Sequence, residues 1–278
     1  MRTIVHLSDL HFGRADAAVL QPLIDTITRI APHVVVVSGD LTQRARSKEF
    51  LEARRFLDAL PQPQIIVPGN HDVPLYNIFS RVVLPLAKYR RHISENVEPS
   101  YVDQEIAVVG INTARALTFK NGRVNDAQIA RVRERLRALD NHMVKIVVTH
   151  HPFDLPAHYG EDMLVGRAAL AMRTLASCGA DLLLAGHLHT SHAGNTDARY
   201  NIAGYSALVV QAGTATSTRG RGETNSFNVI HASSSSIAIE RFSWIPESKR
   251  FSLANTETFE SIRGVGGENK LRWVLKRE

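Results

Sequence analysis

The chain has 278 residues, of which 44% are hydrophobic and 22% are charged, and this composition is typical of a globular protein with a buried core. Lysine and arginine outnumber aspartate and glutamate by 33 to 27, so the net charge of +6 favours an anionic ligand. A single cysteine, Cys178, excludes an internal disulfide, and we interpret it as a small core residue. The sequence shows neither a signal-like segment nor an apolar run of membrane-spanning length, so we expect a cytoplasmic protein without a membrane partner.

Short apolar runs and amphipathic stretches alternate along the first two thirds of the chain. The runs are rich in Val and Ile, as buried strands are, and lie at 4–5, 34–37, 65–67, 108–109, 146–148, 182–184 and 208–210. Helical spacing of apolar residues occurs between them, at 20–30, 50–60, 129–139 and 167–177. This alternation predicts βαβ units and a largely parallel layer of strands.

The segment from Val73 to Arg91 is the least regular insertion. Its apolar residues would form a helical stripe that is broken near Pro85. We expect a helix that packs on the core, and the alternative is a lid for a lipid-like substrate.

The pattern changes after about residue 200. Segments 207–216, 226–232, 236–243 and 271–275 have β character without helices between them, which indicates a mostly antiparallel sheet. We therefore predict two stacked sheets with helices outside, in one α/β domain over residues 1–278. Its motif-bearing α/β part covers about 1–200, and its mostly β part covers about 201–278.

Polar clusters follow five of the predicted strands directly. They contain Asp9 and His11, Asp40, Asn70 with His71 and Asp72, His150 with His151, and His187 with His189. In open α/β sheets, ligands bind beyond the carboxyl ends of the strands, so these clusters are expected to meet at one edge. One such cluster would be weak evidence for a site, whereas five together are strong evidence.

The clustered side chains offer oxygen and nitrogen ligands without a thiolate, which suits Mn, Fe or Zn and argues against a structural zinc site. Seven ligands are too many for one ion and suit two, and a carboxylate can bridge a pair. Two adjacent divalent ions can bind phosphate oxygens, neutralise charge in the transition state and activate the attacking water. The sequence therefore predicts a two-metal phosphoesterase.

The same residues, in the same order, resemble the full motif series of the calcineurin-like metallophosphoesterases, from residue 3 to about 190. The resemblance implies a four-layer α/β/β/α sandwich with two mixed sheets. It also implies that Asp40 bridges two metals. The first metal would be held by Asp9, His11 and His189, and the second by Asn70, His150 and His187. In the same way, it implies that His71 stabilises or protonates the reacting phosphate ester, with Asp72 orienting it.

Within this family, the short chain, the His-Leu-Ser-Asp-Leu-His opening and Gly39-Asp40-Leu-Thr42 look most like bacterial class III cyclic nucleotide phosphodiesterases. We expect a phosphodiesterase for a small anionic substrate such as a cyclic nucleotide. Alternatives are a hydrolase of a larger diester or pyrophosphate, such as a nucleotide-linked lipid precursor, a phosphomonoesterase, or a non-enzymatic scaffold. Nucleic acid is disfavoured because no long basic run is present, and the oligomeric state is open, including a homo-oligomer.

Three residues outside the ligand set are candidates for binding substrate. Asn112 and Arg115 follow the strand at 106–111, and His192 lies three residues beyond His189. Other basic residues in nearby loops could contact a phosphate, with solvated loop charges as the alternative: Lys120, Arg123, Arg219 and Arg221.

Overall fold

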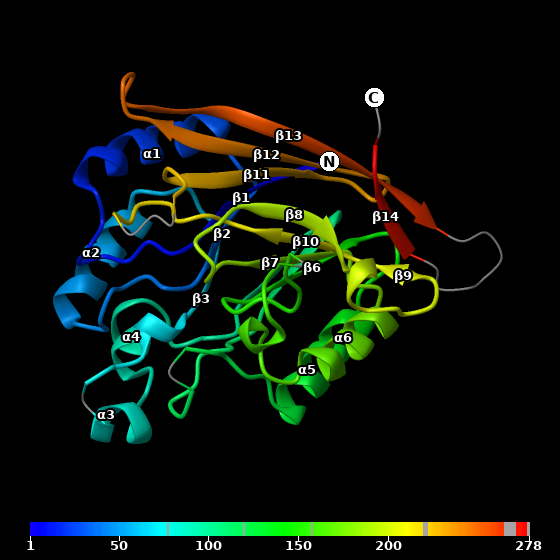
Figure 1. Ribbon diagram of the computed structural model, residues 1–278, viewed down its shortest axis with the longest axis horizontal. Helices are drawn as coiled ribbons and strands as arrows, with labels where there is room; N and C mark the ends of the chain where they lie inside the picture. Colours follow the sequence, from blue (N-terminus) through cyan, green and yellow to red (C-terminus); the bar gives the residue numbers. More distant parts are fainter. Residues whose placement is uncertain (77, 119, 157, 219–221, 264–270, 277–278) are drawn as a thin grey trace.

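Two β-sheets lie face to face, and helices cover their outer faces, in the computed structural model (Figure 1). The structure describes residues 1–76, 78–118, 120–156, 158–218, 222–263 and 271–276. Figure 1 shows β12 and β13 across the top, the second sheet below them, and α5 and α6 beneath that sheet. The expected four-layer sandwich with two mixed sheets is confirmed.

The first sheet has eight strands in the order β3-β2-β1-β11-β12-β13-β14-β9. Its parallel part pairs β1 with β2 and β2 with β3, whereas β11 joins the other side of β1 in antiparallel register. The strands are β1 (Arg2–Leu7), β2 (Val34–Ser38), β3 (Gln64–Val67), β9 (Tyr205–Ser206), β11 (Ser226–Ala232), β12 (Ser236–Ile245), β13 (Arg250–Arg263) and β14 (Leu271–Leu275).

The second sheet has six strands in the order β4-β5-β6-β7-β10-β8, and its central strands β5, β6, β7 and β10 are parallel. These strands are β4 (Ser100–Val102), β5 (Ile106–Gly110), β6 (Val144–Val148), β7 (Leu182–Ala185), β8 (His192–Asn195) and β10 (Leu208–Gln211). The helices are α1 (Ala17–Ile30), α2 (Ser47–Asp58), α3 (Ile78–Val83), α4 (Ala87–His92), α5 (Asp126–Arg137) and α6 (Ala168–Ser177). Three short 3₁₀ turns complete the elements, at Asn70–Asp72, Glu161–Met163 and Thr196–Ala198.

Alternation along the central strands divides the core into layers, because successive strand residues point to opposite faces. Ile4 and Val36 belong to the cluster between the two sheets, which also includes α5 and α6. Val5 and Val37 belong to the cluster under α1 and α2. Both strands are therefore buried on both faces, which explains why they consist of unbroken apolar runs.

Local sequence signals mark the start of α5 and the end of α6. Asn125 accepts a hydrogen bond from the backbone of Gln128, whose side chain in turn accepts from the Asn125 N–H, so a capping box begins α5. Gly179, with φ of +67°, follows α6 and takes the left-handed conformation typical of a helix C-terminus. Cys178 is buried beside it, as expected.

The prediction for 73–91 is half right. Leu86, directly before α4, and Tyr89 on α4 are both buried in the core cluster under α1 and α2, and α4 contacts α2. The residues of α3 do not form the expected buried apolar stripe, because Phe79 and Val82 are exposed while Arg81 is buried. The expected single core-packing helix is instead two short helices that face opposite environments.

The strand β13 was not predicted from the sequence. Its central residues, 254–258, are largely polar, and the register against β12 shifts at Arg241/Phe242, so a simple two-residue alternation is lost. The predicted antiparallel character of the C-terminal part is otherwise confirmed for 226–232, 236–243 and 271–275. The segment 207–216 differs, because β10 joins the second sheet in parallel with β7. Among the described residues, no helix combines the length and apolarity needed to cross a bilayer.

Trp273 tests whether the C-terminal strands unfold together with the rest of the chain. It is fully buried on β14 within the cluster between the sheets, so Trp273→Ala should destabilise the protein by about 3–5 kcal/mol. We expect a single unfolding transition in urea, monitored by circular dichroism, with its midpoint lowered. The neighbouring Val274 is 38% exposed, so Val274→Ala serves as the control with little change. A separate low-stability transition confined to the variant would contradict a single domain.

Candidate metal centre

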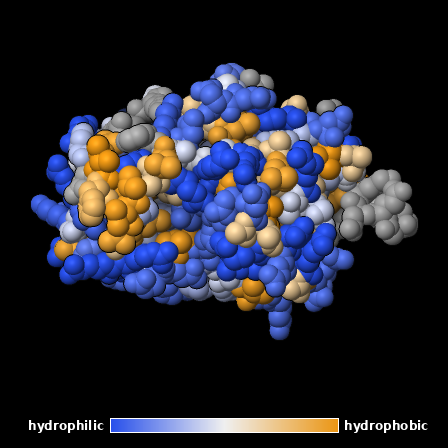
Figure 2. Space-filling view, turned by 90° about the horizontal axis from the view of Figure 1, so that it is seen from below, coloured by the Kyte–Doolittle hydropathy of each residue, from blue (hydrophilic) through white to orange (hydrophobic). Residues whose placement is uncertain are grey.

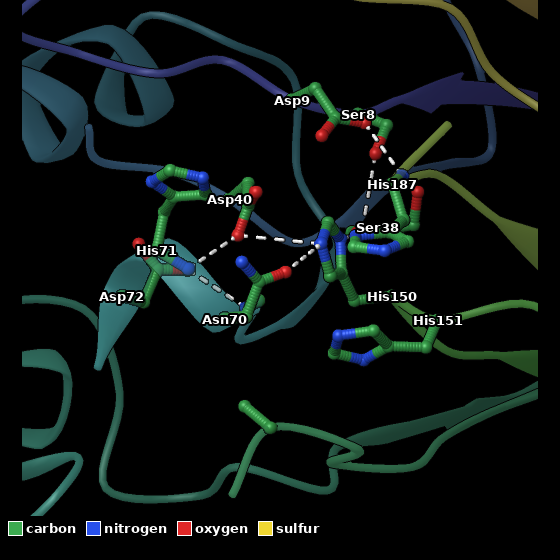
Figure 3. A network of polar contacts seen from close by, with 12 residues as sticks. Ser8, Asp9, Ser38, Asp40, Asn70, His71, Asp72, His150, His151 and His187 are labelled. Atoms are coloured by element: carbon green, nitrogen blue, oxygen red, sulfur yellow. Dashed lines mark hydrogen bonds and ion pairs between the residues drawn. The ribbon is translucent and has the colours of Figure 1, made fainter. Parts of the chain in front are cut away.

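The expected ligands meet where the carboxyl ends of strands from both sheets converge (Figure 3). Asp9 and His11 follow β1, and Asp40 and Asn70 follow β2 and β3. His150 follows β6, and His187 and His189 follow β7. Backbone hydrogen bonds join the loops, including Asp9 N–H to the Gly39 carbonyl at 3.1 Å and Gly186 N–H to the His150 carbonyl at 3.1 Å. The site is thus built on the ends of the two sheets.

One group of ligand atoms comes from Asp9, His11, Asp40 and His189, all buried and within 4.8 Å of one another. The His11 and His189 Nε2 atoms are 3.2 Å apart, and Asp9 Oδ1 lies 3.2 Å from His189 Nε2. Two ligand atoms that each lie about 2.1 Å from a shared ion are roughly 3.0–3.4 Å apart. This group therefore has the spacing of a coordination sphere.

A second group surrounds His150. Its Nε2 lies 3.1 Å from Asn70 Oδ1 and 3.4 Å from Asp40 Oδ1, as Figure 3 shows. The ring centroid of His187 is 5.2 Å from that of His150. This group combines the amide, imidazole and carboxylate ligands that suit a transition metal.

Asp40 belongs to both groups through different oxygens. Its Oδ2 lies 3.8 Å from His11 Nε2, whereas its Oδ1 faces His150. Burial disfavours ionisation, but the neighbouring imidazoles of His150 and His71 outweigh it and hold the pKa of Asp40 well below its usual range. A buried carboxylate that stays ionised between two ligand groups has the geometry of a bridging ligand.

Within the part of the chain that the structure describes, three buried atoms of the centre have no hydrogen-bond partner: Asp9 Oδ1, His11 Nδ1 and His187 Nε2. A buried polar atom without a partner costs free energy, so such atoms are rare in native proteins unless an ion or water satisfies them. Asp9 Oδ1, which faces the rings of His189 and His11, and His187 Nε2 lie one in each half of the centre, and metal ions fit as the partners that these atoms lack.

A carbonyl beneath the centre sets the orientation of His150. Its Nδ1 donates to the Ser38 carbonyl at 2.8 Å, so Nε2 faces Asp40 and Asn70. Burial tends to lower the pKa of His150, but the charge of Asp40 outweighs this effect and raises it to about 9. His187, whose burial and proximity to His150 lower its pKa to about 3, is neutral and ready to coordinate.

His151 lies close to both His150 and His187, with its ring centroid 4.6 Å from that of His187. Both of its ring nitrogens are already bonded, Nε2 to the Lys120 carbonyl at 3.0 Å and Nδ1 to Thr113 Oγ1 at 2.8 Å. A ligand needs a free lone pair, so we assign His151 to positioning the neighbouring ligands and not to coordination, although its ring atoms lie within reach of an ion.

The backbone at the centre has an uncommon conformation. Five of the seven expected ligands have φ between +49° and +73°, a region that non-glycine residues seldom adopt: Asp9, His11, Asp40, His187 and His189. Each such residue costs about 1–3 kcal/mol unless its surroundings hold it in place. The sheets impose this strain, and the strain turns the ligands toward one another.

The glycines beside the ligands allow close packing. A Cβ on Gly69 would lie 2.1 Å from Asp40 Oδ1, and one on Gly186 would lie 1.7 Å from Ser8 Oγ. Only Gly39, with φ of +93°, also needs left-handed backbone. Gly39 is therefore needed for its backbone angle, whereas Gly69 and Gly186 are needed because the loops touch.

His71 stands at the edge of the centre, with its ring 4.9 Å from that of His11 in an edge-to-face arrangement. Its backbone N–H donates to Asp40 Oδ1 at 2.8 Å, and its Nδ1 donates to the Gln43 carbonyl at 2.8 Å. The remaining nitrogen, Nε2, is the one that can face a substrate. This is the placement required of a group that acts on the phosphate without binding a metal.

Asp72 does not orient His71 as expected. Its buried carboxylate accepts hydrogen bonds from the backbone of Leu41, Thr42 and Gly69, and Gln43 holds the His71 ring instead. Burial and the nearby charge of Asp40 raise the pKa of Asp72 to about 6. The carboxylate therefore joins the loop after β2 to the loop after β3. Its effect on the centre is indirect, because these two loops carry Asp40 and Asn70.

The proposed substrate ligands Asn112 and Arg115 are engaged within their own loop. Asn112 Oδ1 accepts from the Ala114 N–H at 2.9 Å. Arg115 donates to the Asn112 and Ala114 carbonyls and to the Gln128 side chain at the start of α5. These contacts indicate that Arg115 supports the loop, and they leave its expected contact with a phosphate without structural support.

His192 begins β8 and lines a hollow with Arg241, Asn255 and Glu257, and none of these residues belongs to the expected ligand set. Its pKa is lowered by burial. Lys120 is exposed and its Nζ lies 3.3 Å from Met163 Sδ. Arg219 and Arg221 lie outside the described residues.

Sequence reasoning missed the residues that hold the ligands in place, chiefly Ser38, Gln43 and Ser8. Ser38 and Gln43 act through backbone carbonyls, which any residue type could supply, so no sequence signal marks them. Ser8 donates from Oγ to the Ser38 carbonyl at 3.2 Å, and its position directly before Asp9 is its sole sequence signal.

Comparison with known proteins gives one local sequence match and several similar folds. A 37% identical match to the glycerophosphodiester phosphodiesterase GpdQ of Enterobacter lignolyticus extends over 81 residues, 25% of this chain and 29% of that protein. The purple acid phosphatase PPD1 of yellow lupin superposes with a TM-score of 0.69 at 13% identity, over 92% of this chain and 53% of that one. A dimetal phosphatase from Danio rerio superposes with a TM-score of 0.60 at 13% identity, over 91% of this chain and 98% of that one.

The chain spans less than two thirds of the length of GpdQ and of the lupin enzyme. The structural likenesses show the fold. The family model described as calcineurin-like phosphoesterase matches residues 2–191, the part of the chain that carries all seven expected ligands. The chain therefore belongs to the calcineurin-like phosphoesterase family.

Proposed function

We propose that this chain is a two-metal phosphodiesterase for small anionic diesters. The observation that carries the proposal is Asp40, whose two carboxylate oxygens face two separate groups of metal-ligating atoms. Asp9, His11 and His189 would hold one ion, and Asn70, His150 and His187 the other. When bound, the ions would supply Lewis-acid activation of the phosphorus centre and of the attacking water. Mn and Fe are the favoured metals, with Zn as an alternative.

Residues of the chain would orient the metal ligands and act on the phosphate ester. The Ser38 carbonyl keeps His150 turned toward Asp40 and Asn70. The Gln43 carbonyl accepts from His71 Nδ1 and leaves Nε2 free, so Nε2, when it also carries a proton, can donate to a phosphate oxygen or pass that proton to the leaving oxygen. Asp72 holds the loops after β2 and β3 together through hydrogen bonds from the Thr42 and Gly69 N–H groups. The net charge of +6 favours the approach of an anion.

Two substrate classes are supported by different observations. The sequence resemblance to class III phosphodiesterases favours a cyclic nucleotide. The local match to a glycerophosphodiester phosphodiesterase favours a glycerol-linked diester. A screen of metal-loaded protein against cyclic nucleotides, glycerophosphodiesters and phosphate monoesters distinguishes them, and turnover of monoesters alone would contradict the diester assignment.

The ligand assignment predicts the metal content. Purified protein supplemented with Mn should contain two ions per chain by elemental analysis. Asp40→Ala should lose both ions, because it removes the shared ligand. Its activity should fall by more than the ~10–100-fold typical of losing a residue that supports a metal ligand. Asp25→Ala, which changes an exposed acid on α1, is the control and should retain both. A single ion per wild-type chain would refute the assignment of two metal ions.

A His71 variant distinguishes a role in the chemical step from a role in metal binding. Because it is placed beside the centre without being needed as a ligand, His71→Ala should keep both metals and lower kcat by about 10²–10⁴-fold. The loss should shrink for nitrophenyl diesters, whose leaving groups need little protonation. An equal loss for good and poor leaving groups would restrict His71 to charge stabilisation, and the loss of a metal would make it a ligand.

Metal binding should release a proton from His150. With its pKa raised to about 9, the metal-free ring is protonated at neutral pH, and Asp40 and Asn70 hold that proton on Nε2. An ion must displace it, so the apparent affinity should rise with pH until about pH 9. Calorimetry in two buffers of different ionisation enthalpy measures the release. A binding enthalpy independent of the buffer at neutral pH would contradict this assignment.

A further inference from the structure

An exposed apolar surface lies on and beside α3, and we call it the α3 face. It consists of Tyr76, Ile78, Phe79, Val82, Leu84 and Leu117. Phe79 is 76% exposed and Leu117 is 82% exposed. Figure 2, which shows the molecule from below, displays a cluster of hydrophobic residues at the end where α3 lies in Figure 1. A cluster of large exposed apolar side chains is uncommon on a protein surface and indicates a contact with something apolar.

The burial of Arg81 holds this face outward. Arg81 is 2% exposed, and its guanidinium donates to the carbonyls of Ala116, Pro74 and Thr118 at 2.6, 2.9 and 3.2 Å. The helix therefore turns its charged residue inward and its apolar residues to solvent, the reverse of an ordinary surface helix. The same bonds tie α3 to the segment that carries Leu117, so the two parts form one surface.

The charges around the α3 face are positive. The sequence contains no Asp or Glu in 41–48, 73–94 or 106–125, the segments that form and flank the face. Exposed basic residues come from each segment, with Arg44, Lys88 and Lys120 among them. The Arg44 guanidinium lies 5.5 Å from the centre of the Tyr76 ring. The nearest acidic residues are Glu49, whose buried carboxylate accepts from the Arg44 N–H, and Glu95, which pairs with Arg90. Asp162 is also close, because its carbonyl accepts from Asn121.

The α3 face borders the edge that carries the metal ligands. Tyr76 follows His71 by five residues in the chain. Arg44, which contacts Tyr76, follows Gln43, whose carbonyl holds the His71 ring. A partner on the α3 face would therefore lie beside the opening of the centre.

We propose that the α3 face docks the protein on an anionic lipid surface. Exposed aromatic and aliphatic side chains beside basic residues are the combination that binds the headgroup region of such a membrane. At six residues, α3 is too short to span a bilayer, so docking would be peripheral. The proposal revises the expectation that the protein has no membrane partner, and it does not depend on the proposed hydrolytic function.

Sedimentation of the full chain with vesicles tests the proposal. The protein should bind vesicles of phosphatidylcholine with phosphatidylglycerol, bind phosphatidylcholine alone weakly, and bind less at high salt. The double variant Ile78→Ser/Phe79→Ser should bind the anionic vesicles about tenfold or more weakly. The control Leu253→Ser/Ile262→Ser changes side chains of β13 that are 53% and 55% exposed, and it should bind as the wild type does.

Three results would overturn the proposal, provided that circular dichroism shows both variants folded. The first is no binding to anionic vesicles, or equal binding by both double variants. The second is a wild-type dimer in light scattering that Ile78→Ser/Phe79→Ser dissociates, which would assign the face to a second copy. The third is loss of turnover of a water-soluble aryl diester in this variant, which would assign the face to the substrate. A protein without any hydrolytic activity could still bind vesicles, so the two proposals fail independently.

Discussion

The need to satisfy the Asp40 carboxylate from two sides governs the architecture around it. This side chain is buried where the ends of the two sheets converge, and it faces His11 from the first sheet and His150 from the second. Such a carboxylate is tolerated only when hydrogen-bond donors, cationic groups or metal ions compensate its charge, as the His71 backbone N–H does on one side. The sandwich supplies these partners because strand ends from both sheets open onto one point, and the α/β layers bury the remainder of each strand.

Strain and tight contact are the consequences of bringing many loops to that point. The left-handed backbone of Asp9, His11, Asp40, His187 and His189 would be unfavourable in isolation. Hydrogen bonds between the loops hold these angles, and Gly39, Gly69 and Gly186 give the room that the loops require. Locally unfavourable residues at a site that the rest of the fold supports are a common mark of function.

Much of this could be read from the sequence, because buried parallel strands are unbroken apolar runs and the ligands come directly after them. The fold class and the ligand clusters followed from that pattern. The long strand β13 did not, because it is half exposed and shifts register. The burial of Arg81 was equally hidden, since its partners are backbone carbonyls. For Arg115 the sequence suggested a role that the structure does not support. Its position after a strand suggested a substrate contact, whereas its guanidinium donates to Gln128 in the capping box of α5.

The pairing of β1 has a consequence for how the chain is made. β1 lies in the interior of its sheet, with β2 on one side and β11 on the other. Its partner β11 begins only at Ser226, so during synthesis one edge of β1 stays unpaired while most of the chain leaves the ribosome. All seven expected ligands are by then already translated. An unpaired strand edge is a template for wrong association, so nascent chains stalled before Ser226 carry the complete set of expected ligands on a sheet that is still open to aggregation.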